Sequence, residues 1–264
     1  MKTVDEAHFS TLKKWYDSYA DTMKNGDKQL EDAITLKYEH TCRVIREMEL
    51  LCESIALKGA LLQCARIASL LHDVARFEQF KKYRTFSDRQ SEDHARTGCA
   101  IIKKKKLLDT LPDEAKHLIV TAIKHHNAVA LPETLNEKEL LLCRLLRDAD
   151  KLDIYRIALD HYINPDPKRK DTVQVSIPDG NGITPEVLDG VRKRRIVSYG
   201  KVKTVSDFKM IQLGWVYDLN FPHSFACVNK RAYLEDLEKH LPDQPDVHEV
   251  VRAAKEYTIT RAAG

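Results

Sequence analysis

The sequence predicts an all-α protein. Glycine and proline, the residues that most often end helices, number only nine each among 264 residues. Apolar side chains recur at three- and four-residue spacing through several long stretches, the pattern of helices that bury one face. Hydrophobic residues make up 43% and charged residues 31%, as in ordinary globular proteins. The length suits one large helical domain, or a core with a smaller helical appendage.

Three helices are expected at the start of the chain. The first covers 5–24 and ends at Asn25-Gly26, a typical C-terminal signal. The second runs over 28–57, where the apolar positions follow helical spacing: Leu30, Ile34, Val44, Met48 and Leu51. The third covers 59–78 and contains the apolar run ALLQCARIASLLHDVARF.

The middle of the chain resumes helical periodicity after the polar segment KKYRTFSDRQ, which shows none. Ser91 is expected to cap a helix that continues to about 107, with Glu92 and Asp93 in its first turn. Pro112 suits the first turn of a helix that ends at Asn127. A long leucine-rich helix follows over about 134–162.

Helical periodicity gives way to loop-like sequence after residue 162, and this change predicts the domain boundary. Residues 163–184 look like a loop, with a possible short strand at 173–177, and residues 184–264 return to short helices. We therefore expect a helical core over 1–162 and a helical C-terminal section over 163–264 that packs on it.

The compartment and partners are inferred from composition. The formal charge of +3 gives no argument for binding nucleic acid or membrane. The six cysteines form no Cys-x-x-Cys pair, which favours reduced core thiols and argues against thiolate-bound zinc. The chain starts without the apolar segment of a signal peptide and has no apolar stretch of about 18 residues, so we expect a cytoplasmic protein without a membrane anchor.

His72 and Asp73 are the sharpest chemical feature, because they stand at the end of a very apolar helical run. A carboxylate is costly to bury there unless it is paired or binds a metal. Adjacent helical residues point about 100° apart, so both side chains can reach one ion beside the helix. Imidazole and carboxylate together suit zinc, manganese, iron and related divalent metals.

Other histidines and aspartates lie beside apolar stripes on separate helices. They are His40, the pair His125-His126, and three aspartates in the leucine-rich helix: Asp148, Asp150 and Asp153. Each alone is ordinarily a satisfied core histidine or a solvated aspartate. Periodicity does not choose among the aspartates, since Asp150 and Asp153 share one face and Asp148 lies on another.

The ordered series His40, His72-Asp73 and Asp150 resembles the H…HD…D pattern of the HD-domain superfamily, over about residues 28–160. The stretch LLHDVARFEQF…YRTFSDRQSEDHARTG also resembles a subgroup of uncharacterised bacterial HD proteins. The resemblance implies an HD-domain helical bundle with a helical C-terminal extension, in which these four residues bind a divalent metal. It selects Asp150 because the ligand follows Ala and precedes a basic residue and Leu, and it leaves Asp148 and Asp153 as supporting partners or salt-bridge residues.

Similarity to binuclear members implies a second ion. It suggests His94 and His125 as further ligands, with His126 as the substitute if the helix is rotated and with Asp73 bridging. Gly98, one turn after His94, would let another backbone approach closely. The Gly-Lys and GYP motifs of HD-GYP phosphodiesterases are absent here, which argues against cyclic di-nucleotide hydrolysis.

The activity implied by the resemblance is metal-dependent hydrolysis of a small phosphate ester, such as a nucleotide, by metal-bound hydroxide. The metal could be Mn, Mg, Fe, Co, Ni or Zn. Asp73, Arg76 and Lys151 are the expected catalytic residues, and Arg76, Arg84 and Arg96 are expected to hold the phosphate. The lysines of 103–106 are interpreted as a solvated face.

Two other functions fit the same residues. One is a di-iron oxygenase of the HD type, because His40, His72, Asp73, His94, His125 and Asp150 have the number and type of its ligands. The other is a non-catalytic nucleotide-binding module, which the complete ligand set disfavours.

Overall fold

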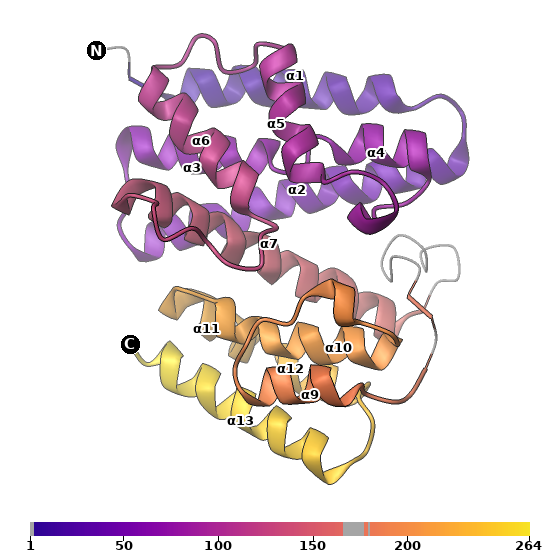
Figure 1. Ribbon diagram of the computed structural model, residues 1–264. Helices are drawn as coiled ribbons and strands as arrows, with labels where there is room; N and C mark the ends of the chain where they lie inside the picture. The colour runs from indigo at the N-terminus through magenta and orange to yellow at the C-terminus, as the bar shows by residue number, and fades with distance from the viewer. Residues whose placement is uncertain (1–2, 166–176, 179) are drawn as a thin grey trace. The chain divides into compact units, whose positions relative to one another are not determined.

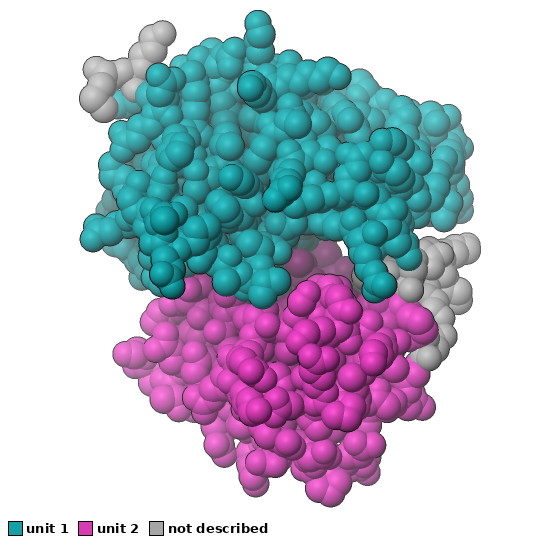
Figure 2. Space-filling model, viewed as in Figure 1, with its two compact units in different colours: residues 1–153 teal, residues 154–264 magenta. Residues whose placement is uncertain are grey.

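The computed structural model describes residues 3–165, 177–178 and 180–264, and within these ranges it contains helices and no strand. The possible strand at 173–177 falls mainly on 166–176, outside the described residues. Contacts divide the chain into two compact units, Met1–Asp153 and Ile154–Gly264 (Figure 2). The division lies inside one long helix, earlier than the expected boundary at 162.

The first unit is a bundle of helices (Figure 1). Helix α2 packs against α3 and α4, while α6 packs against α3 and α5. The helices are α1 (Glu6–Met23), α2 (Lys28–Ser54), α3 (Gly59–Leu71), α4 (Arg76–Tyr83), α5 (His94–Lys104), α6 (Asp113–His125) and α7 (Glu137–Ile163), with a 3-10 turn η1 (Asp88–Gln90) between α4 and α5.

Polar caps set where several of these helices begin. Asp27 accepts a hydrogen bond from Leu30 N at the start of α2. At the start of α7, the Asn136 side chain accepts bonds from Lys138 N and Glu139 N, and the Glu139 carboxylate accepts one from Asn136 N. This reciprocal pair is a capping box.

Two of the expected helices differ from the structure. The single helix expected over 59–78 is broken at 72–75, although no glycine or proline marks the break. The helix expected to be capped by Ser91 begins instead at His94, because the Asp93 carboxylate accepts bonds from Ala95 N and Arg96 N. The correct cap lies two residues further on and puts His94 at the first helical position.

Among its described residues, the second unit contains the end of α7 and five more helices. Inside it α11 packs on α13 and α10 packs on α9, and Tyr155 and Tyr162 at the end of α7 donate hydrogen bonds to Gln212 on α10. The helices are α9 (Pro185–Arg192), α10 (Val205–Gly214), α11 (Pro222–Lys230), α12 (Tyr233–Glu238) and α13 (Pro245–Ala262), with 3-10 turns η3 (Tyr199–Lys201) and η4 (Trp215–Asp218).

The cysteines fit the interpretation as core thiols. All six are free, and Cys52, Cys64, Cys143 and Cys227 are buried. Burial raises the pKa of Cys52 to about 12, so its thiol stays protonated. No helix in the described part of the chain is long and apolar enough to cross a membrane.

Candidate metal centre

The break after α3 positions the His-Asp pair. Backbone N–H groups of Val74 and Arg76 bond to carbonyls only three residues back, those of Leu71 and Asp73, at 3.2 and 2.9 Å. This tightened turn joins α3 to α4. His72 and Asp73 are both buried at this turn. Gly98 of α5 lies against it, but a Cβ there would be 3.8 Å from the His72 carbonyl oxygen, an ordinary van der Waals distance, so this contact does not require glycine.

The four residues of the H…HD…D series converge in the first unit. His40 Nε2 lies 3.3 Å from His72 Nε2 and 3.1 Å from Asp150 Oδ1. Asp73 Oδ2 lies 3.5 and 3.6 Å from the same two imidazole nitrogens. The atoms come from α2, the turn after α3, and α7, and we call them the first ligand group.

A second set of donor atoms faces the other oxygen of Asp73. Asp73 Oδ1 lies 3.5 Å from His94 Nε2 and 3.9 Å from His126 Nε2, and the two nitrogens are 2.9 Å apart. His94 is the first residue of α5 and His126 caps the end of α6. Together with Asp73 Oδ1 these form the second ligand group, so one carboxylate serves both groups.

Of the two adjacent histidines, the structure brings His126 into the cluster. His126 is buried and His125 is part-exposed, and no candidate ligand group in the described residues includes His125. Arg147 holds this end of α6 in place, because its Nη1 donates to the carbonyl oxygens of His125, His126 and Ala128.

Every clustered imidazole is oriented by an acceptor at Nδ1. A hydrogen on Nδ1 leaves the Nε2 lone pair directed at the cluster, which is the arrangement that metal-ligating histidines require. The acceptors are the carbonyls of Ser69 and Ile123 for His72 and His126, and the carboxylates of Asp153 and Asp88 for His40 and His94, at 2.6 to 2.8 Å. Asp153 is thus a supporting partner, as expected.

The protonation states suit a cation. Burial by itself favours the neutral acid, but Lys37 and nearby imidazoles bring the pKa of Asp73 well below its ordinary value. The pKa of Asp150 is also well below its usual range, since bonds from His40 and His72 outweigh burial. Burial and the neighbouring imidazoles lower the pKa of His126 to about 3. Ionised carboxylates and neutral imidazoles are the forms that bind divalent metals.

The pKa of His40 shifts in the opposite direction to that of His126. Burial and the Lys37 charge disfavour its protonation, yet the carboxylates of Asp150 and Asp153 raise its pKa overall. Positive charge is therefore stabilised at this position. Two histidine nitrogens and two carboxylate oxygens fit a divalent ion, and the mixed N and O donor set suits Mn, Fe, Co, Ni or Zn better than Mg.

Two cationic side chains contact the ligand atoms. Lys37 Nζ lies 2.8 Å from Asp73 Oδ2, and its side chain is 15% exposed. Sequence analysis missed Lys37, although it lies one turn before His40 on α2. Arg76 places Nε 3.4 Å from Asp73 Oδ1 and Nη2 3.3 Å from His94 Nε2, and its Nη1 bonds to Gln79, Phe86 and Asp88.

Two of the remaining predicted cations pair with aspartates outside the ligand groups. Arg84 and Arg96 each pair with an N-cap aspartate, Arg84 with Asp27 at 2.6 Å and Arg96 with Asp93 at 3.6 Å. Arg96 is 80% exposed. Neither pairing brings the arginine to the first ligand group. Lys151 follows Asp150 on α7 and is part-buried.

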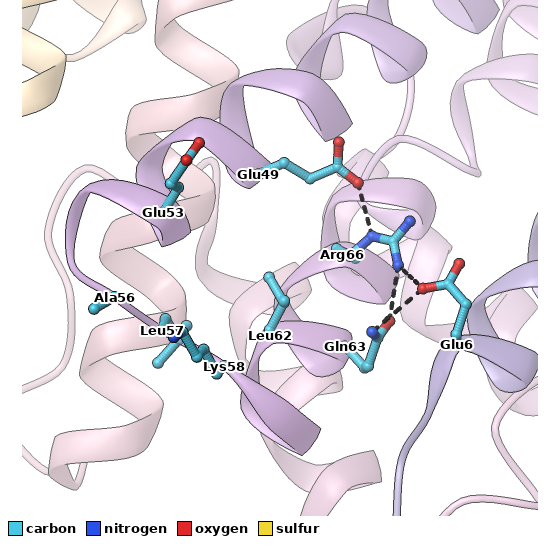
Figure 3. Close-up of a pocket in the computed structure, with 9 residues that line it drawn as sticks. All are labelled: Glu6, Glu49, Glu53, Ala56, Leu57, Lys58, Leu62, Gln63 and Arg66. Atoms are coloured by element: carbon cyan, nitrogen blue, oxygen red, sulfur yellow. Dashed lines mark hydrogen bonds and ion pairs between the residues drawn. The ribbon is translucent and has the colours of Figure 1, made fainter.

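A cavity of about 580 Å³ in the first unit shares no lining residue with the ligand groups (Figure 3). Arg66 at its wall is already bound by Glu49, at 2.8 Å, and by Glu6 and Gln63. The cavity lining is Glu6, Glu49, Glu53, Ala56, Leu57, Lys58, Leu62, Gln63 and Arg66.

Comparison with protein families agrees with this geometry. Residues 38–155 match the family model described as HD domain. This part of the chain is an HD domain. The matched residues include all six clustered side chains, from His40 to Asp150, and the HD domain belongs to a superfamily of metal-dependent hydrolases. Searches of curated proteins and of solved structures found no match.

Proposed function

We propose that the protein is a metal-dependent phosphohydrolase that acts on a small phosphate ester and uses two divalent ions. The observation that carries the proposal is the position of Asp73, whose two oxygens face two different pairs of imidazole nitrogens. A carboxylate in this position can bridge two ions, and such pairs commonly serve phosphoryl transfer.

The two ligand groups define which residues would hold the ions. His40, His72 and Asp150 would hold one, His94 and His126 the other, and Asp73 both. Bound divalent ions would lower the pKa of water to near neutrality and offset negative charge on the phosphate oxygens.

The chain's own cations would bind the ester. Lys37 Nζ and Arg76 Nη2 both lie within 3.3 Å of a ligand atom, close enough to contact a phosphate held at the centre. Both also flank the Phe86 ring, with Lys37 Nζ 5.2 Å and the Arg76 guanidinium carbon 5.8 Å from its centroid. Charge-assisted contacts to phosphate fix the position of the reacting group, which is most of what an enzyme contributes to phosphoryl transfer.

The six clustered residues also retain the oxygenase alternative, with His126 in place of His125. The two cations beside the centre favour an anionic substrate and therefore the phosphohydrolase. Iron content after aerobic purification, colour and oxygen consumption separate the two reactions.

A panel of phosphomonoesters and phosphodiesters, assayed with Mn, Mg, Co, Ni, Zn and Fe(II), tests the proposal. We expect metal-dependent phosphate release from at least one class, and a loss of more than about 100-fold in His72→Ala, because that imidazole belongs to the ligand cluster. His117→Ala is the matched control: His117 is 68% exposed, pairs with Glu139 and should leave turnover unchanged.

Either of two results would overturn this assignment. Wild-type turnover in His72→Ala would remove the centre from the reaction. Stoichiometric iron with oxygen consumption and no phosphate release would favour the oxygenase.

A further inference from the structure

Asp88 contacts the second ligand group from a segment outside the helices that carry the ligands. It opens the turn η1, in the segment 84–93 that connects α4 to α5. Its Oδ2 lies 2.6 Å from His94 Nδ1, so it orients the imidazole whose Nε2 faces Asp73. Its carboxylate is 31% exposed, in contrast to the almost fully buried Asp73.

Both oxygens of Asp88 face hydrogen-bond donors. Oδ1 accepts from Arg76 Nη1 at 2.9 Å and from Gln79 Nε2 at 3.0 Å, while Oδ2 accepts from His94 and from Asn127 Nδ2 at 3.3 Å. An asparagine offers only one acceptor oxygen and would turn its NH₂ group towards donors on the other side. The position therefore requires a carboxylate and not merely a polar side chain.

Arg76 connects Asp88 to the shared carboxylate. The same guanidinium donates to Asp88 Oδ1 through Nη1 and to Asp73 Oδ1 through Nε. Asp73 Oδ1 is the oxygen that faces His94 and His126, so the contact reaches only the second ligand group.

The first ligand group has a counterpart in Asp153. Asp153 Oδ2 lies 2.7 Å from His40 Nδ1, and Arg43 donates to both of its oxygens at 2.6 and 3.1 Å. Asp153 stands one turn after Asp150 on α7, so the same helix carries ligand and partner. Each of the two aspartates thus contacts the Nδ1 atom of one imidazole in its ligand group.

We propose that Asp88 is the positioning residue of the second metal ion and sets its affinity separately from that of the first ion, which Asp153 serves. The inference rests on the proposed two-ion centre. Asp88 acts by fixing the Nδ1 hydrogen of His94, so that the Nε2 lone pair is available, and by holding the 84–93 segment against Arg76. It needs no contact with substrate.

Metal counting tests the inference without an activity assay. Wild-type protein, Asp88→Asn and Asp153→Asn are titrated with Mn(II), and bound metal is measured by elemental analysis and by electron paramagnetic resonance. We expect two ions and an exchange-coupled spectrum for the wild type. Asp88→Asn should bind the second ion about 10–100-fold more weakly and give the spectrum of isolated Mn(II), the usual size of effect for a partner of a ligating histidine. Asp153→Asn should weaken the first ion instead.

Glu92→Gln is the matched control for the segment. Glu92 ties 84–93 to Lys82, Tyr83 and Thr97 but contacts no ligand, so two ions should remain. Circular dichroism of the metal-free variants checks that each is folded, and Asp88→Ala replaces Asp88→Asn if the latter is not.

The outcomes distinguish a failure of the proposed two-ion centre from a failure of the proposed role of Asp88. A wild type that binds fewer than two ions contradicts the two-ion centre. A wild type with two ions and an Asp88→Asn protein that binds both with unchanged affinity contradicts the role of Asp88 alone. If Glu92→Gln weakened binding of the second ion as much as Asp88→Asn does, the loss would be due to disrupted folding of the 84–93 segment and would contradict the positioning role of Asp88.

Discussion

The two ligand groups on either side of Asp73 are built from different parts of their helices. In the first group, His40 and Asp150 lie well inside α2 and α7, each 27 residues long, and only His72 lies at a helix end. In the second, His94 is the first residue of α5 and His126 the residue after α6 ends. The partner of His94 comes from a 3-10 turn, whereas the partner of His40 comes from a helix.

This difference predicts a difference in rigidity. Residues inside long packed helices open only with much of the fold, while helix ends and connecting segments open locally at lower free energy. We therefore expect the first group to bind its ion more tightly and to tolerate changes nearby, and the second group to respond to small changes in 84–93 and in the end of α6.

The largest effect is expected at Asp73, whose carboxylate is common to both ligand groups. Asp73→Asn removes the charge that faces both groups, so both ions should be lost and activity should fall by more than about 100-fold, beyond the range for indirect partners. Equilibrium dialysis with Mn(II) measures the ions. Retention of one tightly bound ion would show that Asp73 is not common to both groups.

The next largest effect is expected from substitutions that remove a ligand from only one of the two ligand groups. His126→Ala should leave one ion bound, whereas His40→Ala should disturb the tighter site. Metal that binds only the folded protein stabilises it by about 2.7 kcal/mol at one hundred times its Kd. Thermal denaturation with and without Mn(II) should therefore show a smaller metal-dependent shift in His40→Ala than in His126→Ala. The reverse order would contradict the proposed difference in rigidity.

A smaller effect is expected at Lys37, which contacts the shared carboxylate from the side of the first group. One charge-assisted hydrogen bond contributes about 1.5–3 kcal/mol, so Lys37→Ala should lower kcat/KM by about 10–100-fold with both ions still bound. Steady-state kinetics on the best substrate of the panel measures this. Lys28→Ala, an exposed lysine at the start of the same helix, should change nothing. Unchanged kcat/KM in Lys37→Ala would remove this lysine from substrate binding.

The smallest effect is expected at Asn127, which bonds to Asp88 at 3.3 Å and to Asp93 at 3.2 Å and so joins the end of α6 to the start of α5. The bonds are exposed, and a neutral hydrogen bond contributes about 0.5–1.5 kcal/mol. Asn127→Ala should weaken only the second ion, by a few-fold in a competitive titration. An equal change at the first ion would show that the two groups are not independent.

The convergence of four of the clustered residues was predictable from the sequence. His40, His72, Asp73 and Asp150 stand at positions where helical spacing and the ordered pattern agree. The same spacing also distinguishes His126 from His125, because residue 126 continues the buried stripe of Ile119, Ala122 and Ile123 at i+7, i+4 and i+3. Applied to α2, it would have found Lys37, three residues before His40.

The break at 72–75 and the contacts of Asp88 were not predictable in this way. The break at 72–75 contains no glycine or proline and keeps right-handed helical angles at His72 and Ala75. The sequence therefore contains no residue there that signals the end of a helix. Asp88 lies in a segment without periodicity, where the contacts of a side chain depend on the path of the chain. Its four donor partners come from α4, α5 and the end of α6, and only the folded chain brings them together.

Anomalous diffraction from crystals soaked in Mn(II) tests the two-ion centre most directly. The account predicts two peaks at the manganese edge on opposite sides of Asp73, one in contact with Nε2 of His40 and His72 and the other with Nε2 of His94 and His126. A single peak shared by all four imidazoles, or peaks only outside this cluster, would contradict it.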